Sequence, residues 1–147
     1  MMLSKRTTQA GFSLMELMIA LAVLGLIMAA VGPALMNRYR SAQKKTANTS
    51  IKMMRNAVDS FELDVGIVPQ RLNDLVKRPV ASDYYTPEMV SNWMEGGYIR
   101  GGKIPRDPWN NKFRYRLTPD AAQRYELYSY GPSGKGAPKS EWLRGGK

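Results

Sequence analysis

The chain has 147 residues, 44% of them hydrophobic, and a formal net charge of +10. It contains neither Cys nor His, which excludes disulfides, thiolate metal sites and the commonest catalytic base and metal ligand. The positive balance is typical of a solvated basic surface, and it also suits nucleic acid, an anionic membrane surface or an acidic partner.

The N-terminus combines a short basic leader with a long apolar run. Residues 1–11 (MMLSKRTTQAG) are polar and basic, and residues 17–36 contain no charge. As a helix, such a run spans about 30 Å, the thickness of a bilayer core. A secretory signal peptide has a shorter apolar region with its cleavage site behind it, and a plain single-pass anchor leaves Glu16 unexplained. A prepilin-type signal, cut ahead of the apolar helix, accounts for both features.

Glu16 is the only acidic residue before Asp59, and it lies within the apolar stretch 12–36. A carboxylate near the bilayer is costly and marks a functional position with a partner. Cleavage between Gly11 and Phe12 gives Phe12 a free α-amino group about one helical turn from Glu16. In a fibre, Glu16 of one subunit then pairs with the Phe12 amine of a neighbour and sets the register. The alternative is a Glu16 that reaches the membrane edge without a partner.

The segment GFSLMELMIALAVLGLIMAAVGP resembles the N-terminus of type IV pilins and pseudopilins, on Gly11, Phe12, Leu14, Glu16 and Pro33. The resemblance implies that a prepilin peptidase removes the leader after Gly11, that Phe12 is then N-methylated, and that Glu16 guides assembly. The basic leader fits cytoplasmic retention under the positive-inside rule.

Pro33 lies inside the apolar helix, where proline removes one hydrogen bond and clashes one turn back. We expect a kink or local melting at residues 29–33; the alternative is that the membrane helix ends there. Beyond it, apolar residues at intervals of four and three predict an amphipathic helix over 37–65 that stops at Gly66. Its stripe consists of Ala47, Ile51, Met54, Val58 and Phe61, with Leu63 and Val65 extending the apolar character.

Residues 66–147 are few for an independent core without disulfides, so we expect the stripe of the long helix to complete it. Short helical turns are predicted at Leu72–Val76 and after Pro87. The predicted fold class is therefore α+β. A long N-terminal helix, transmembrane in its first half, packs on a small C-terminal domain with a short antiparallel sheet.

Two segments of this domain alternate apolar and polar side chains and predict the paired strands, residues 112–117 and 125–130. A polar turn joins them. Arg114 and Arg116 share the outer face of the first strand, and we expect Glu126 to face them across the strands.

The C-terminal half also resembles a known family, through GGYI at 96–99, IPRDPW at 104–109 and YSYGPSG at 128–134. These segments are similar to the major pseudopilin of the type II secretion system. The DPW motif predicts a structural loop of Asp107, Pro108 and Trp109, with Trp109 as a core aromatic that caps the sheet edge.

The resemblance implies a structural subunit. Many copies form a periplasmic pseudopilus, which an ATPase-driven platform extends to push folded proteins through an outer-membrane channel. The implied partners are other copies of the chain, a prepilin peptidase, minor pseudopilins and the inner-membrane assembly platform. The implied location is the inner membrane, crossed once, with the C-terminal domain in the periplasm. The domains are then a leader 1–11, a transmembrane and assembly helix 12–36, its amphipathic continuation 37–65 and a globular domain 66–147.

The family typically binds calcium in its C-terminal loop through acidic side chains, which supply the hard oxygen ligands that calcium requires. Here Ser133 stands where the family has an Asp, and the tail contains one acid, Glu141. We therefore expect no metal and no other cofactor. The tail is expected to be held by Trp142 packing or by Glu141 pairing with Lys135 or Lys139.

The alternative function is that of a type IV pilus major pilin, which acts in adhesion, motility or DNA uptake. Such pilins often carry a C-terminal disulfide, which this chain cannot form. A nucleic-acid-binding pilin would use the bases and aromatics between Arg100 and Arg116, but a half-buried strand with solvated arginines explains the same residues. We expect no nucleic-acid partner. We also expect no enzymatic activity, since no catalytic motif is evident.

Overall fold

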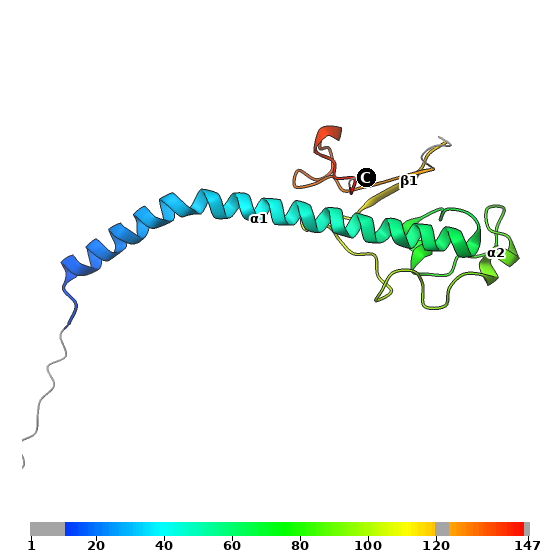
Figure 1. Ribbon diagram of the computed structural model, residues 1–147, viewed down its shortest axis with the longest axis horizontal. Coiled ribbons are helices and arrows are strands. Elements are labelled where there is room, and N and C mark those ends of the chain that lie inside the picture. Colours follow the sequence, from blue (N-terminus) through cyan, green and yellow to red (C-terminus); the bar gives the residue numbers. More distant parts are fainter. Residues whose placement is uncertain (1–10, 120–123, 146–147) are drawn as a thin grey trace, which may run out of the picture. The chain divides into compact units, whose positions relative to one another are not determined.

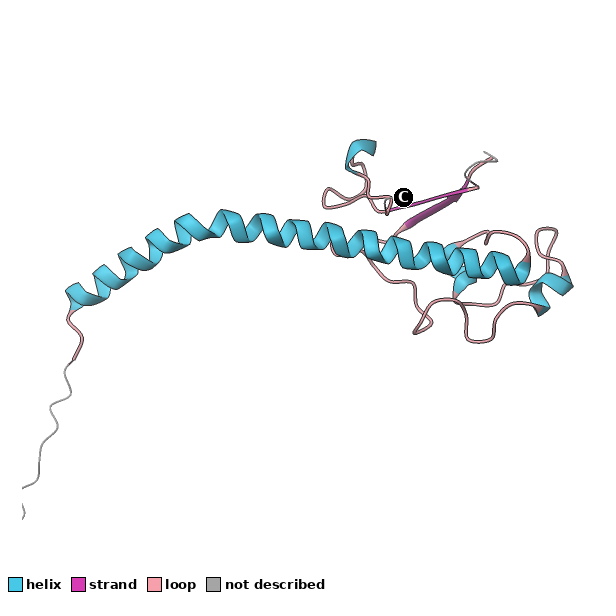
Figure 2. Cartoon of the chain, viewed as in Figure 1, coloured by secondary structure: helices cyan, strands magenta, loops and turns pink. Residues whose placement is uncertain are grey.

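A computed structural model of the protein describes residues 11–119 and 124–145. The elements in chain order are helix α1 (Leu14–Val65), 3₁₀-helix η1 (Leu72–Leu75), helix α2 (Pro87–Ser91), strands β1 (Arg114–Leu117) and β2 (Tyr125–Tyr128), and 3₁₀-helix η2 (Lys139–Glu141) (Figure 1). Figure 2 distinguishes these helices and strands from the loops that join them. The predicted α+β fold is confirmed. Residues 1–10 of the predicted leader and residues 120–123 of the predicted turn lie outside the described residues.

The chain divides into two compact units, with the boundary between Arg40 and Ser41. In the first unit, the described part of the chain leaves its apolar side chains uncovered: Phe12 is 83% exposed and Leu26 74%. This part of α1 is long and apolar enough to cross a membrane. Among residues 11–119 and 124–145, nothing covers this part of the helix.

α1 remains helical through Gly32 and Pro33. The prediction for residues 29–33 is a kink or local melting. Local melting is wrong for this chain, and so is the alternative that the helix ends there, while a kink stays a prediction. Proline removes only one hydrogen bond from the ladder, and the turns on either side keep theirs.

In the second unit, α1 buries the predicted stripe completely. Ala47, Ile51, Met54, Val58 and Phe61 are each 0% exposed. Of the two residues that extend the apolar character, Val65 is also buried, whereas Leu63 is 85% exposed. Leu63 lies outside the stripe because a residue two positions after Phe61 lies about 200° further around the helix.

α1 ends at Gly66, as predicted. Gly66 has φ of 89°, and its N–H donates to the carbonyl of Glu62 at 2.8 Å. A glycine in the left-handed region is a common way to end a helix, because the backbone carries no Cβ there. The chain then turns back, so that α2 lies beside the C-terminal end of α1 (Figure 1).

The loops that follow α1 complete the core. Five of their residues share one buried cluster with the stripe. They are Tyr85 ahead of α2, Trp93, Ile99 and Phe113 between α2 and β1, and Leu127 in β2. Within that cluster, the ring of Phe61 meets the ring of Tyr85 at 6.2 Å and that of Tyr98 at 5.3 Å between centroids. Edge and tilted contacts of this kind add to the free energy of apolar burial.

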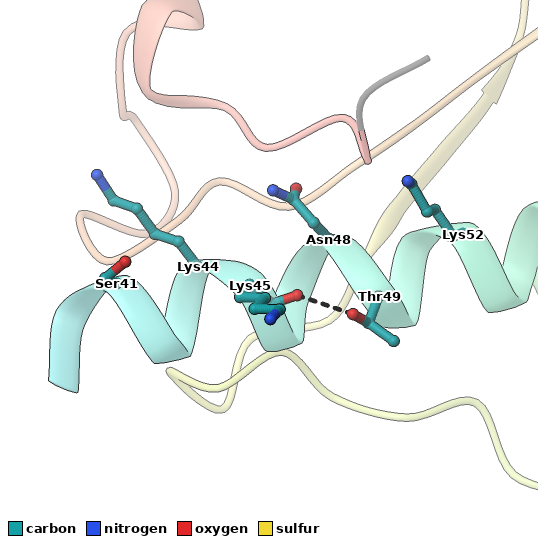
Figure 3. Close-up of a pocket in the computed structure, with 6 residues that line it drawn as sticks. All are labelled: Ser41, Lys44, Lys45, Asn48, Thr49 and Lys52. Atoms are coloured by element: carbon teal, nitrogen blue, oxygen red, sulfur yellow. Dashed lines mark hydrogen bonds between the residues drawn. The ribbon is translucent and has the colours of Figure 1, made fainter. Parts of the chain in front are cut away.

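Outside the stripe, α1 carries polar side chains on its surface. Six of these residues line a shallow depression of about 400 Å³, namely Ser41, Lys44, Lys45, Asn48, Thr49 and Lys52 (Figure 3). The hydroxyl of Thr49 donates to the carbonyl of Lys45 at 3.0 Å.

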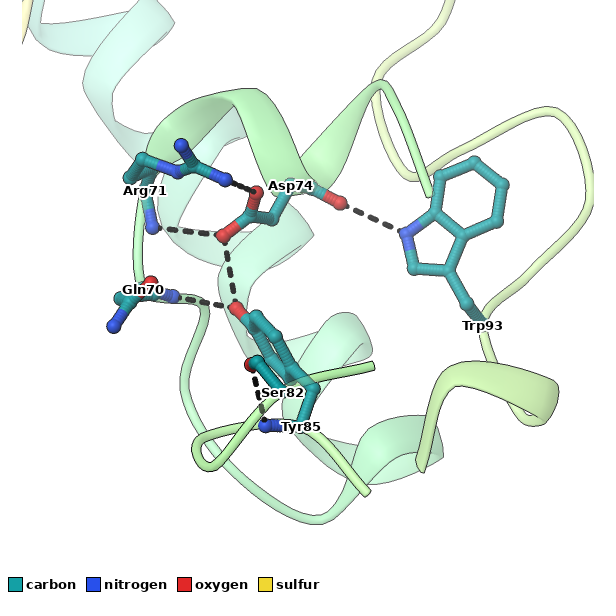
Figure 4. Close-up of polar contacts among 6 residues, drawn as sticks. All are labelled: Gln70, Arg71, Asp74, Ser82, Tyr85 and Trp93. Carbon is teal, nitrogen blue, oxygen red and sulfur yellow. Dashed lines mark hydrogen bonds and ion pairs between the residues drawn. The ribbon is translucent and has the colours of Figure 1, made fainter. Parts of the chain in front are cut away.

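Asp74 is the centre of a buried polar network that fixes η1 against the loops (Figure 4). Its carboxylate accepts hydrogen bonds from the Tyr85 hydroxyl at 2.8 Å and from the Arg71 N–H at 3.0 Å. Its carbonyl accepts from the Trp93 indole N–H at 2.8 Å. Burial, reinforced by the nearby carboxylate, raises the pKa of Tyr85, so this hydroxyl stays protonated and keeps donating.

Gly97 allows the chain to pass close to η1. The N–H of the next residue, Tyr98, donates to the carbonyl of Leu75 at 2.7 Å. A Cβ on Gly97, which has φ of 79°, would lie 2.8 Å from the same carbonyl oxygen. A side chain at position 97 would therefore break this contact.

The two strands pair antiparallel, with Arg116 opposite Glu126 and Tyr115 opposite Leu127. Arg116 and Glu126 form the predicted ion pair at 2.8 Å. The strands are shorter than predicted, since residues 112 and 129 form only isolated bridges with Arg106 and Leu143.

The stripe leads to a test of the core. Phe61→Ala removes a completely buried ring and should lower the free energy of unfolding by about 3–5 kcal/mol. Leu63→Ala, two residues away on the exposed side, is the matched control and should change stability little. Thermal unfolding of the full chain in detergent, followed by circular dichroism, measures both. Equal losses in the two variants would contradict the assignment of the stripe.

Candidate functional site

The first candidate site is the N-terminus of α1. Ser13 directly precedes the helix, and its hydroxyl oxygen accepts a hydrogen bond from the N–H of Glu16 at 3.1 Å. Its carbonyl accepts from the N–H of Leu17 at 3.2 Å. Ser13 is thus the N-cap, and Ser-x-x-Glu is the spacing of a capping box. The prediction missed Ser13, although this spacing was a signal that could have found it.

Glu16 lies in the first turn of α1 and is exposed. Its negative charge is favourable there, because the helix dipole is positive at the N-terminus. Within residues 11–119 and 124–145, the ion pairs are Arg71–Asp74, Arg116–Glu126 and Arg124–Glu62. The described chain therefore gives Glu16 a defined backbone position but no cationic partner.

The second candidate site is the loop that begins at Asp107. Asp107 and Pro108 occupy the first two positions of a turn, in which the N–H of Asn110 donates to the carbonyl of Asp107 at 2.9 Å. Proline at the second position and aspartate at the first favour this geometry. Asn110, at the end of the turn, has φ of 68°.

The carboxylate of Asp107 is buried and fully engaged. One oxygen accepts from the N–H groups of Trp109 at 3.1 Å and Asn111 at 2.7 Å, and the other accepts from the Ser129 hydroxyl at 2.6 Å. Hydrogen bonds to an ionised acceptor are stronger than neutral ones. Asp107 therefore joins its own turn to the residue that follows β2.

Ser129 is a structural residue that the prediction did not single out. Its backbone exchanges two hydrogen bonds with Leu143, at 2.9 and 3.0 Å, and its hydroxyl also accepts from the N–H of Gly131 at 2.9 Å. Ser129 is 0% exposed. A polar residue at an inward position of an alternating strand was the signal that could have found it, because such a group needs partners.

Trp109 differs from its prediction. It is half-buried and lies outside the apolar core cluster, so it is not a core aromatic. The tryptophan of the core is Trp93, which is 7% exposed. Trp109 follows proline in a tight turn whose geometry is set by Asp107, and this keeps its ring at the surface.

The tail is held by Trp142, as predicted. Its ring stacks flat on Tyr128, with 4.3 Å between centroids and 1° between planes, and meets Tyr130 edge-on at 5.6 Å. Its indole N–H donates to the carbonyl of Ala137 at 2.9 Å. The guanidinium of Arg55 reaches from α1 to the carbonyl of Arg144 at 3.0 Å.

Glu141 is held differently from the prediction. Its carboxylate accepts from the Ser133 hydroxyl at 2.6 Å, and within the described residues it forms no ion pair with Lys135 or Lys139. The ammonium of Lys139 instead lies 6.0 Å from the centroid of the Trp142 ring. A neutral donor within the same loop thus replaces the predicted ion pair.

The oxygen atoms that the tail offers as ligands do not fit a calcium site. Calcium takes six to eight oxygen ligands and favours several carboxylates. The tail provides Glu141 alone, and the nearby Asp107 already accepts three hydrogen bonds. Within the described part of the chain, no group of three or more Asp or Glu residues could hold a metal ion.

Comparison with known proteins identifies the family. The profile described as "Type II secretion system (T2SS), protein G" matches residues 34–141. The chain belongs to this family. A second profile, the prokaryotic N-terminal methylation motif, matches residues 6–32 of the chain. These residues include Gly11 and Phe12, between which cleavage is predicted, and Glu16.

Relatives of the same name extend over most of the chain. The type II secretion system core protein G of Pseudomonas aeruginosa is 36% identical over 134 residues, which are 89% of each chain. The protein of the same name from Vibrio cholerae is 33% identical and covers 90% of this chain and 87% of its own. The predicted resemblance is confirmed: the chain is a type II secretion pseudopilin, not a type IV pilus pilin.

A solved structure shows the same fold. The crystal structure of the major pseudopilin from the type 2 secretion system of enterohaemorrhagic Escherichia coli matches with a TM-score of 0.57 and 24% sequence identity. The match covers 71% of this chain and 88% of that one.

The Asp107 loop leads to a second test. Asp107→Ala leaves three donors without their acceptor, two of them backbone N–H groups of the turn, and should cost about 3 kcal/mol or more. Asp83→Ala removes an exposed carboxylate from another loop and should be nearly neutral. Denaturant unfolding of the two variants measures the difference. An Asp107→Ala variant as stable as the Asp83→Ala control would contradict the role given to this carboxylate.

Proposed function

We propose that this pseudopilin is processed between Gly11 and Phe12 by a prepilin peptidase and then N-methylated on Phe12. The mature chain crosses the inner membrane once through the apolar part of α1, with the C-terminal region in the periplasm. Its copies polymerise, together with minor pseudopilins and on an inner-membrane assembly platform, into a pseudopilus that drives folded proteins across the outer membrane. The subunit contributes structure and no catalysis.

The observation that carries this proposal is the exposed Glu16 at the start of α1. The apolar residues around it, such as Phe12 and Leu14, are about four-fifths exposed, at 83% and 79%. An ionised side chain among such residues needs a cationic partner once water is removed. The α-amino group that cleavage creates on Phe12 is a partner that every neighbouring subunit supplies.

This pairing sets the register of the fibre. A subunit at the wrong height leaves one carboxylate and one ammonium group buried and unpaired, which is strongly unfavourable. The apolar surfaces around them hold adjacent helices together without fixing their relative height. Charge pairing therefore specifies the position, while apolar contact supplies the association.

The pairing is tested by Glu16→Ala. Breaking a buried pair costs about 3–5 kcal/mol, so fibre yield should fall by on the order of a hundredfold or more. Fibres are sheared from cells that overproduce the chain and are quantified by immunoblot, with total membrane-inserted subunit as the reference. Ser13→Ala is the matched control, since it removes the helix cap and leaves the carboxylate in place. Normal fibres from Glu16→Ala would show the pairing mechanism to be wrong.

We further propose that the tail of this subunit is closed without calcium. The flat stack of Trp142 on Tyr128 and the Ser133–Glu141 hydrogen bond hold the segment between the end of β2 and Leu143. The cationic side chains of Lys135, Lys139 and Arg144 also oppose the approach of a dication.

Removal of calcium tests this second proposal. A site saturated about a thousandfold above its dissociation constant adds roughly 4 kcal/mol of stability, and a chelator removes it. We expect the melting temperature of the full chain to be the same with and without chelator. Trp142→Ala should lower the melting temperature equally in both conditions. A fall of several degrees on chelation of the unmodified chain would show that calcium binds.

A further inference from the structure

The helix segment that follows the apolar run carries bases and no acids. Between Glu16 and Asp59 the sequence contains no acidic residue and six basic ones. These are Arg38, Arg40, Lys44, Lys45, Lys52 and Arg55. A charge run of this kind, directly after a membrane-spanning segment, is the arrangement that attracts anionic lipid.

Three of the bases line the shallow depression of α1 already described, which we call the lysine depression (Figure 3). Lys44, Lys45 and Lys52 line it together with the hydroxyl of Ser41 and the amide of Asn48. All three lysines are exposed and, among residues 11–119 and 124–145, none forms an ion pair. The lining thus offers several hydrogen-bond donors and three positive charges, which suits a phosphodiester group.

The tail lies beside Lys44, which also lines a neighbouring depression with Ser140, Glu141 and Leu143. Glu141 keeps its negative charge there, because its carboxylate accepts from the neutral Ser133 hydroxyl. Against this one acid, residues 131–145 carry three bases, Lys135, Lys139 and Arg144. The tail as a whole is therefore positively charged.

The position along the chain brings these lysines within reach of a membrane surface. Lys44 and Lys45 follow Met36, the last residue of the charge-free run, by eight and nine residues. In a helix this corresponds to about 12–14 Å. The headgroup layer on each side of a bilayer core is roughly 5–8 Å thick, and a lysine side chain extends back toward it by snorkelling.

We propose that the lysine depression docks on anionic phospholipid headgroups of the leaflet from which the C-terminal region emerges, and so holds the subunit at the membrane before assembly. This inference rests on the membrane location in the proposed function. Each base near an anionic surface strengthens binding by roughly fivefold. Lys44 and Lys45 therefore contribute most to the docked position, because Lys52 follows Met36 by sixteen residues, about 24 Å along a helix.

A second copy of the chain is a poorer partner for this surface. Each copy carries the same six bases in this segment, so two such segments repel each other. The acids nearest along α1 are Asp59, Glu62 and Asp64, and Glu62 is already paired with Arg124. A lipid leaflet instead presents many anions in one plane.

The test uses the full chain in bilayers. Because the chain has no Cys, Ser140→Cys introduces one thiol for a fluorescent donor in the exposed tail, and an acceptor is placed on lipid headgroups. Energy transfer is compared between vesicles of phosphatidylcholine alone and vesicles that also contain phosphatidylglycerol. We expect greater transfer with phosphatidylglycerol, reduced by high salt. Replacing Lys44, Lys45 and Lys52 by Gln should lower the ratio of docked to undocked chains by about 25-fold or more, since Lys44 and Lys45 contribute about fivefold each.

The matched control replaces Lys77, Arg100 and Lys103 by Gln, which removes the same charge from exposed positions elsewhere, and should leave the transfer unchanged. Equal transfer in the two lipids, or equal effects of the two triple variants, would overturn the proposal. So would transfer that depends on the protein-to-lipid ratio and not on phosphatidylglycerol, since a second copy would then be the partner. A chain that alkaline carbonate extracts from the vesicles would contradict the membrane location itself.

Discussion

A row of buried residues on α1, from Ala47 to Val65, forms the wall against which the C-terminal region folds. The region after Gly66 has two short strands and three short helical elements, and it contains no disulfide because the chain has no Cys. Such a segment buries too little apolar surface to be stable alone. Its loops become ordered because Tyr85, Trp93, Ile99, Phe113 and Leu127 share one cluster with the stripe. The helix that supplies the wall is the same helix that continues into the apolar run.

Two buried carboxylates, those of Asp74 and Asp107, hold the loops in place on this wall through hydrogen bonds. Asp74 holds η1 to Tyr85 and Trp93. Asp107 holds its turn to Ser129, and Ser129 in turn pairs with Leu143 of the tail. Both carboxylates are buried and surrounded by donors, which is the condition under which a buried charge stabilises a fold. The C-terminal loop is thus tied to the sheet by side chains of the chain itself, and the aromatic stack of Trp142 closes it.

The apolar half of α1 differs from the stripe, because its apolar side chains are exposed. Its one carboxylate, Glu16, has a cap from Ser13 but no cation among the described residues. These features are unfavourable in a soluble monomer and suit a helix in lipid or against its own copies. The chain belongs to the protein G family of pseudopilins, which are subunits that assemble. This explains why the helix leaves an apolar surface and a carboxylate uncovered. A base-rich segment follows it, from Arg38 to Arg55.

The sequence by itself determined the features that depend on local pattern. The intervals of four and three in α1 predicted the buried stripe, and the alternation at residues 112–117 and 125–130 predicted the strands, although both are shorter in the structure. The lone Glu16 within the apolar stretch 12–36 predicts an assembly helix. Only the tertiary structure decided which distant groups meet. It placed Trp93 and not Trp109 in the core. It showed that Glu141 accepts a hydrogen bond from Ser133 and, within the described residues, does not pair with a lysine. It also showed that Ser129 links Asp107 to the tail. These choices depend on how separate loops pack on one helix, and periodicity along the chain carries no information about contacts of that kind.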